Sequence, residues 1–185
     1  MTDDGIVPDD KDWTWVLERP CPECGFDAST TPATAVAGLI RQNAADWQAL
    51  LAEGRITGER TQPDRWSTLE YACHVRDVYR RYDERVRLMQ TEDDPLYPNW
   101  DQDASAIEER YAEQDPEEVL AALSANAEAM AARFEQVDAS GPDTWGRRGR
   151  RPDGRSFTND TISRYLVHDP IHHLWGVPQA RPRPS

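Results

Sequence analysis

The chain has 185 residues, roughly the length of a single domain, and carries a formal net charge of −13. Because an acidic chain repels phosphate groups, we expect neither nucleic acid nor a membrane surface as a partner. No segment approaches the ~20 apolar residues of a membrane-spanning helix, and the acidic N-terminal residues do not resemble a secretory signal. We therefore expect a cytoplasmic protein.

The first part of the chain predicts an arm followed by a helix. Residues 1–32 lack helical periodicity and are rich in aspartate and proline, so we expect an extended N-terminal arm whose tryptophans pack on the main body. From about Pro32 to Ala52, apolar residues recur at helical spacing, which predicts the first helix of the bundle. Gly54 is placed to end this helix.

The second helix has a clear start. The sequence Ser67-Thr68-Leu69-Glu70 forms a capping box, in which the hydroxyl and the carboxylate satisfy free backbone N–H groups. We expect this helix to run to about Met89. A proline-containing loop over residues 91–102 and a short helix from Ala104 to Gln114 should follow.

Two further helices complete the expected fold. Asp115-Pro116 is a typical helix start, with aspartate as the N-cap and proline at the first helical position. Residues 138–157 form a loop whose Asp153-Gly154 pair favours a short hairpin. The last helix should run from about Thr158 to Trp175. These patterns predict an all-α four-helix bundle over residues 33–176, between the arm and a flexible tail at 177–185.

The histidines are the strongest candidates for a site. His168 and His172 are four residues apart, about 400° around a helix, so their imidazoles share one face. His74 lies beside the apolar stripe of the second helix and would supply a third imidazole. Three protein ligands leave coordination positions open for a reacting molecule, and imidazole suits zinc, nickel, copper or iron. His173, turned about 100° from His172, is expected to take no part.

Other interpretations of these residues remain open. A pair of histidines at this spacing also occurs as a solvated or core pair, which would leave a purely structural bundle. Pro170 removes one helical hydrogen bond, so the last helix either kinks there or begins afresh at Asp169. Asp77 and Asp169 are the carboxylates best placed to orient a ligand imidazole.

Two segments resemble the DinB/YfiT-like superfamily. They are residues 66–77, which contain His74, and residues 165–175, which contain His168 and His172. The resemblance spans roughly residues 33–176 and rests on one histidine in the second helix and His-x-x-x-His in the fourth. It implies a bundle with a long crossover between the second and third helices, a homodimer, and one divalent metal ion, zinc or nickel, held by His74, His168 and His172. The arm and the arginine-rich loop are additions to that pattern.

The resemblance also implies a class of reaction. Related proteins are metal-dependent thiol S-transferases and isomerases that use mycothiol, bacillithiol or glutathione. All 21 basic residues except Lys11 are arginine, a bias typical of GC-rich DNA, which favours mycothiol. We therefore expect a small-molecule thiol and an electrophile as partners, with Asp77 or Tyr165 assisting proton transfer. The alternative is a metal-binding bundle without turnover that acts in stress response or protein interaction.

Two more features have no single interpretation from sequence. Cys21-Pro22-Glu23-Cys24-Gly25 resembles half of a zinc site, but also fits a redox pair or a packed turn with free thiols. Cys73 is expected in the core. The loop arginines either bind an anionic cosubstrate or are solvated near the acidic N-terminal residues; they are Arg147, Arg148, Arg150, Arg151 and Arg155.

Overall fold

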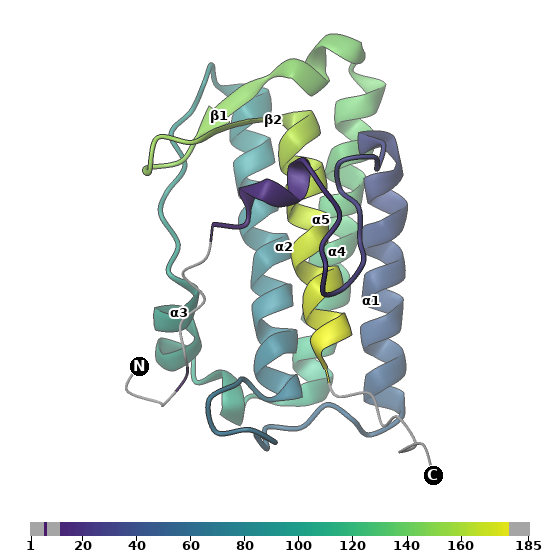
Figure 1. The fold of residues 1–185 in the computed structure, drawn as a ribbon, viewed down its shortest axis with the longest axis vertical. Coiled ribbons are helices and arrows are strands. Elements are labelled where there is room, and N and C mark those ends of the chain that lie inside the picture. Colours follow the sequence, from purple (N-terminus) through teal and green to yellow (C-terminus); the bar gives the residue numbers. More distant parts are fainter. Residues whose placement is uncertain (1–5, 7–11, 178–185) are drawn as a thin grey trace.

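The computed structural model describes Ile6 and residues 12–177, and these form a four-helix bundle as predicted (Figure 1). The bundle helices are α1 (Val36–Ala52), α2 (Thr68–Thr91), α4 (Pro116–Ala139) and α5 (Asn159–Gly176). Both α1 and α2 pack against α4 and against α5. The two helices that come first in the chain therefore lie diagonally across the bundle. None of the described helices has the length and apolar character needed to cross a membrane.

The predicted helix starts are confirmed. The Ser67 hydroxyl accepts a hydrogen bond from the Glu70 backbone N–H, and the Glu70 carboxylate accepts one from the Ser67 N–H. At α4, the Asp115 carboxylate accepts from two backbone N–H groups, with proline at the first helical position. The first helix begins later than expected, because the 3-10 turn η2 (Ala33–Ala35) precedes Val36.

The connection between α2 and α4 contains two short helices where one was expected. They are α3 (Gln102–Glu108) and the 3-10 helix η3 (Tyr111–Glu113). Arg110 adopts a left-handed backbone with φ of 52°, which interrupts helical hydrogen bonding between them. Because α3 packs against α2, the crossover lies along one side of the bundle (Figure 1).

The predicted hairpin is present between α4 and α5. After the 3-10 helix η4 (Pro142–Gly146), strands β1 (Arg148–Arg150) and β2 (Ser156–Thr158) pair antiparallel. Gly149 allows a close approach here, because a Cβ on it would come within 2.1 Å of the Tyr97 hydroxyl oxygen. The hairpin leads directly into α5, whose N-cap is Thr158.

One polar residue crosses the core between the helices. Asn43 of α1 is buried, and its amide donates to the Pro170 carbonyl at 3.0 Å and accepts from the Tyr79 hydroxyl at 2.8 Å. Helix α5 continues through Pro170, so the alternative of a fresh start at Asp169 is wrong. Cys73 is buried in the core, as expected.

The N-terminal arm crosses the outer face of α5 (Figure 1). Its 3-10 helix η1 (Thr14–Leu17) contacts α5, and Val16 is fully buried. The Trp13 ring packs on two histidines of α5, as expected for a tryptophan of the arm. The acidic residues at positions 3, 4, 9 and 10 and the tail at 178–185 lie outside the described residues.

Candidate metal centre

Helix α5 presents potential ligands on two neighbouring faces. Tyr165, Asp169 and His173 follow one another at four-residue spacing, and His168 and His172 form a second row offset by one position. Adjacent helical residues are turned about 100° from each other, so the two rows point in different directions. One row faces α2 and the crossover, and the other faces the N-terminal arm.

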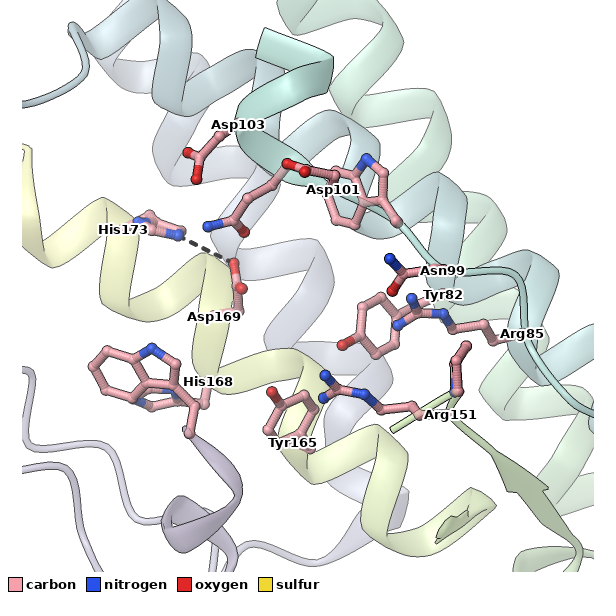
Figure 2. A pocket seen from close by; sticks show the side chains of 14 residues that line it. Tyr82, Arg85, Asn99, Asp101, Asp103, Arg151, Tyr165, His168, Asp169 and His173 are labelled. Atoms are coloured by element: carbon pink, nitrogen blue, oxygen red, sulfur yellow. Dashed lines mark ion pairs between the residues drawn. The ribbon is translucent and has the colours of Figure 1, made fainter. Parts of the chain in front are cut away.

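The row facing α2 forms a three-residue cluster with His74. His74 Nε2 lies 3.2 Å from Asp169 Oδ1. His173 Nε2 lies 3.4 Å from the same oxygen, and Figure 2 shows this pair as a dashed line. One donor atom from each residue lies within 4.8 Å of the other two. Two imidazole nitrogens and one carboxylate oxygen are a donor set that binds zinc, nickel or iron, and three ligands leave positions open.

Aromatic rings fix the His74 imidazole. His74 is fully buried in α2, and its ring stacks on Trp100 of the crossover with centroids 5.5 Å apart and planes 11° apart. Trp66, just before α2, packs near it at 5.2 Å. The capping box that starts α2 at Ser67 therefore also positions this ligand, because His74 follows it by two turns.

The surroundings of Asp169 and His173 favour the protonation states in which these two groups bind metals. Burial opposes ionisation of Asp169, but the imidazoles of His173 and His74 outweigh it and hold the pKa of Asp169 below its usual range. Burial lowers the pKa of His173 to about 3, although Asp169 opposes the shift. At neutral pH the cluster thus contains a carboxylate and a neutral His173, which are the forms that coordinate metals.

The cluster opens into a cavity of about 570 Å³ (Figure 2). Asp169 and His173 line one side, together with Trp100, Asp101 and Asp103 of the crossover. Trp13 of the arm forms part of the wall. A cavity of this size matches those that bind small molecules, so a ligand could reach the open coordination positions.

The other side of the cavity is basic and aromatic. It carries Tyr82 and Arg85 from α2, Arg151 from the hairpin and Tyr165 from α5 (Figure 2). The Arg85 guanidinium lies 4.6 Å from the centre of the Tyr82 ring. Burial raises the pKa of Tyr165, so its phenol is protonated at neutral pH and can donate a hydrogen bond into the cavity.

The second row of α5 meets the arm in a four-residue cluster. Cys21, Cys24, His168 and His172 each offer one ligand atom, and all four atoms lie within 4.8 Å of one another. Cys21 Sγ is 3.7 Å from His172 Nδ1. Cys21 and His168 are buried, and both cysteines are free thiols.

The three histidines predicted as one ligand set are thus divided. Of the described residues, two groups have metal-binding geometry; His74 belongs to one, and His168 and His172 belong to the other. His173, expected to take no part, is the α5 histidine that meets His74, because it is the residue turned toward α2. Asp169, expected to orient a ligand, contributes its own oxygen to the cluster. The signal was present in the sequence, since Asp169 and His173 have the same four-residue spacing.

Asp77, the other predicted catalytic residue, lies in a different network. Its carboxylate accepts from the Arg76 guanidinium at 3.0 and 3.1 Å and from the Tyr111 hydroxyl. Asp77 is buried and does not line the cavity. It therefore links the crossover to α2 through Tyr111. Tyr165, the alternative residue for proton transfer, lines the cavity.

The loop arginines mostly pair with acidic groups or carbonyls. Arg147 donates to the Met89 and Glu92 carbonyls, and Arg150 pairs with Asp94. Arg155 pairs with Asp12 of the arm and with Asp153. Arg151 also pairs with Asp153. Of the five loop arginines, it is the one that lines the cavity.

Comparison with known proteins identifies the family. A family model of the DinB superfamily matches residues 57–175, more than half of the chain, so this protein belongs to the DinB superfamily. Among solved structures it is similar to YfiT from Bacillus subtilis, described as a probable metal-dependent hydrolase with an unusual four-helix bundle topology. That match has a TM-score of 0.67 at 17% identity and covers 78% of this chain and 83% of YfiT. No curated protein shows a significant match.

Proposed function

We propose that this protein is a metal-dependent enzyme that activates a small thiol in the central cavity for attack on an anionic electrophile. The observation that carries the proposal is the convergence of His74 with Asp169 and His173, the latter two of which line a 570 Å³ cavity. A divalent ion bound there would lower the pKa of a thiol or water by several units and so supply a nucleophile at neutral pH.

The residues of the chain have distinct parts in this proposal. His74 and His173 provide imidazole nitrogens, and Asp169 provides a carboxylate oxygen whose single negative charge offsets half of the charge of a divalent ion. Arg85 and Arg151 bind the anionic group of the substrate across the cavity. Tyr165, which stays protonated, donates a hydrogen bond or a proton to the reacting substrate.

The arginine-rich and lysine-poor composition favours mycothiol as the thiol. Zinc or nickel as the metal rests on the resemblance to the DinB/YfiT-like superfamily. Hydrolysis is a second candidate, because the structurally similar YfiT is described as a probable metal-dependent hydrolase. In that case water takes the place of the thiol, and the same three ligands and the same arginines serve the reaction.

The test is a metal-loaded assay on the whole chain. Zinc- or nickel-loaded protein is incubated with mycothiol, bacillithiol or glutathione and monochlorobimane, and in parallel with a panel of amides and esters without thiol. The proposal expects thiol conjugation that disappears in Asp169→Asn and after chelation. Turnover of an amide or ester without thiol would establish the hydrolase instead. Stable metal binding with no turnover in either arm would overturn both and leave a non-catalytic metal protein.

A further inference from the structure

We propose a second metal site in this protein, a structural zinc ion bound by Cys21, Cys24, His168 and His172 that fastens the N-terminal arm to α5. The proposal does not depend on the reaction proposed for the cavity, although His168 also lines the cavity wall (Figure 2). Both cysteines precede residue 57, where the match to the family model begins. Two thiolates and two imidazoles are a donor set typical of closed zinc sites.

The distances fit tetrahedral zinc. Zinc–sulfur bonds of about 2.3 Å and zinc–nitrogen bonds of about 2.0 Å place neighbouring ligand atoms roughly 3.3–3.8 Å apart. The 3.7 Å between Cys21 Sγ and His172 Nδ1 lies in this range, and the remaining separations are within 4.8 Å. The four ligand atoms are therefore already gathered close to the spacing that a single zinc ion requires.

The turn that carries the cysteines has the form of a metal-binding knuckle. The Cys21 carbonyl accepts a hydrogen bond from the Gly25 N–H at 2.9 Å, and the Cys21 N–H donates to the Phe26 carbonyl at 2.9 Å. Gly25 has φ of +76°, a conformation that favours glycine and folds the chain back tightly. Cys21 and Cys24 are thereby held on the same side of the turn.

The surroundings of His168 and His172 suit imidazoles that bind a metal ion, and a pair of histidines that only packs in the core would not require them. His172 has Nδ1 toward Cys21 and Nε2 toward the Glu23 carboxylate at 3.8 Å, the arrangement in which a carboxylate orients a ligating imidazole. His168 is 3% exposed, and its Nε2 is a buried atom without a hydrogen-bond partner. Since such an atom costs free energy, a bound ion supplies a partner that the protein lacks.

A closed site also explains the surroundings better than a redox pair does. Cys21 is 1% exposed, and Trp13 packs on both imidazoles with centroids 5.4 and 5.0 Å away. Redox exchange requires an accessible thiolate, and the burial of Cys21 opposes this. Four protein ligands leave no position for substrate, in contrast to the three-ligand cluster in the cavity.

Cobalt substitution separates the two sites. Protein purified without a histidine tag under reducing conditions is stripped of metal and loaded with Co²⁺. We expect two ions per chain, one of which gives thiolate-to-cobalt charge-transfer absorption. Cys24→Ser should lose this absorption and one equivalent of metal, whereas Cys73→Ser, which alters a cysteine outside the cluster, should keep both.

His74→Ala distinguishes failure of this proposal from failure of the proposed function. This variant should lose the cobalt ion of the cavity cluster, which has no sulfur ligand, and should keep the thiolate-to-cobalt absorption of the second site. If Cys24→Ser does not fold, thiol titration of the wild-type zinc protein replaces it, and removal of the metal by a chelator should increase the number of reactive thiols by two. Two results would overturn the zinc site. One is bound cobalt that shows no thiolate absorption although all three thiols are reduced. The other is a Cys21–Cys24 disulfide that persists in protein purified under reducing conditions.

Discussion

His172 and His173 are consecutive residues of α5, yet their imidazoles belong to different clusters. His172 Nδ1 lies 3.7 Å from Cys21 Sγ, and His173 Nε2 lies 3.4 Å from Asp169 Oδ1. The turn of about 100° between neighbouring helical residues is sufficient to send one ring to the arm and the other to α2. A single helix thus supplies ligands to both candidate metal sites.

Alanine substitution of the two histidines tests this division. His173→Ala should abolish metal binding in the cavity and the activity that depends on it. The loss of metal affinity should exceed the roughly 10–100-fold loss that follows removal of a residue that only orients a ligand. His172→Ala should keep the cavity metal and a large part of the activity. Metal analysis and the thiol assay provide the measurement. Equal loss of the cavity metal in both variants would contradict the assignment of His173.

Arg85 tests the anionic character of the substrate. Arg85→Gln should raise KM by roughly 10-fold or more, because a hydrogen bond to a charged group contributes about 1.5–3 kcal/mol. Arg87→Gln is the matched control, since Arg87 is exposed on the same helix and does not line the cavity. Steady-state kinetics on the best substrate should separate the variants. Equal KM values for both would contradict the role of Arg85.

Asp77 should stabilise the fold without serving the reaction. Asp77→Asn removes a buried charge from Arg76 and Tyr111, and we expect a loss of about 3 kcal/mol in the free energy of unfolding with metal content unchanged. Asp83→Asn on the same helix breaks a more exposed pair with Arg133 and should cost less than about 1 kcal/mol. Chemical denaturation monitored by circular dichroism measures both losses.

The Asp77 contribution should also depend on pH. Burial raises its pKa, but Arg76 and Tyr111 outweigh burial, so the pKa of Asp77 is lowered in the folded protein. A lowered pKa gives stability that is fully present above the unfolded value of about 3.9 and is lost as pH falls through the folded value. The difference between wild type and Asp77→Asn should be constant near neutrality and shrink in acid. A difference that grows in acid would contradict this role.

Asn43 should be required for a stable α5. Asn43→Ala removes the donor to the Pro170 carbonyl and leaves the buried Tyr79 hydroxyl without its acceptor, for a loss of about 1–3 kcal/mol. Gln42→Ala, one position away, alters an exposed side chain and should change stability by less than about 0.5 kcal/mol. Thermal denaturation of both variants is the measurement. Equal melting temperatures would contradict the bridging role of Asn43.

The fold was predictable because its signals are local. The capping box at Ser67 and Glu70 and the Asp115-Pro116 start act within one helical turn, so sequence alone located α2 and α4. The split of the crossover at Arg110 was not predictable, because its left-handed backbone depends on how the crossover packs on α2.

The candidate sites were only partly predictable. The sequence indicated α5 and His74 as sources of ligands. Two rows of α5, His168 with His172 and Asp169 with His173, have the same four-residue spacing, so spacing alone does not identify the row that meets His74. Packing of α5 against α2 selects Asp169 and His173. From the sequence, Cys21 and Cys24 supplied only two of the four ligands that a zinc site needs. The other two, His168 and His172, come close to the cysteines only in the tertiary structure. Contacts across such long separations leave no local pattern.

The position of Cys21 and His172 in the chain bears on biosynthesis. They are 151 positions apart, so the arm leaves the ribosome long before the helix that it contacts. At about 5–20 residues per second, synthesis of the intervening chain takes roughly 8–30 s, during which the cysteines have no histidine partners. During that interval they are exposed to oxidants and competing cations, and docking of the arm has to be among the last events of maturation.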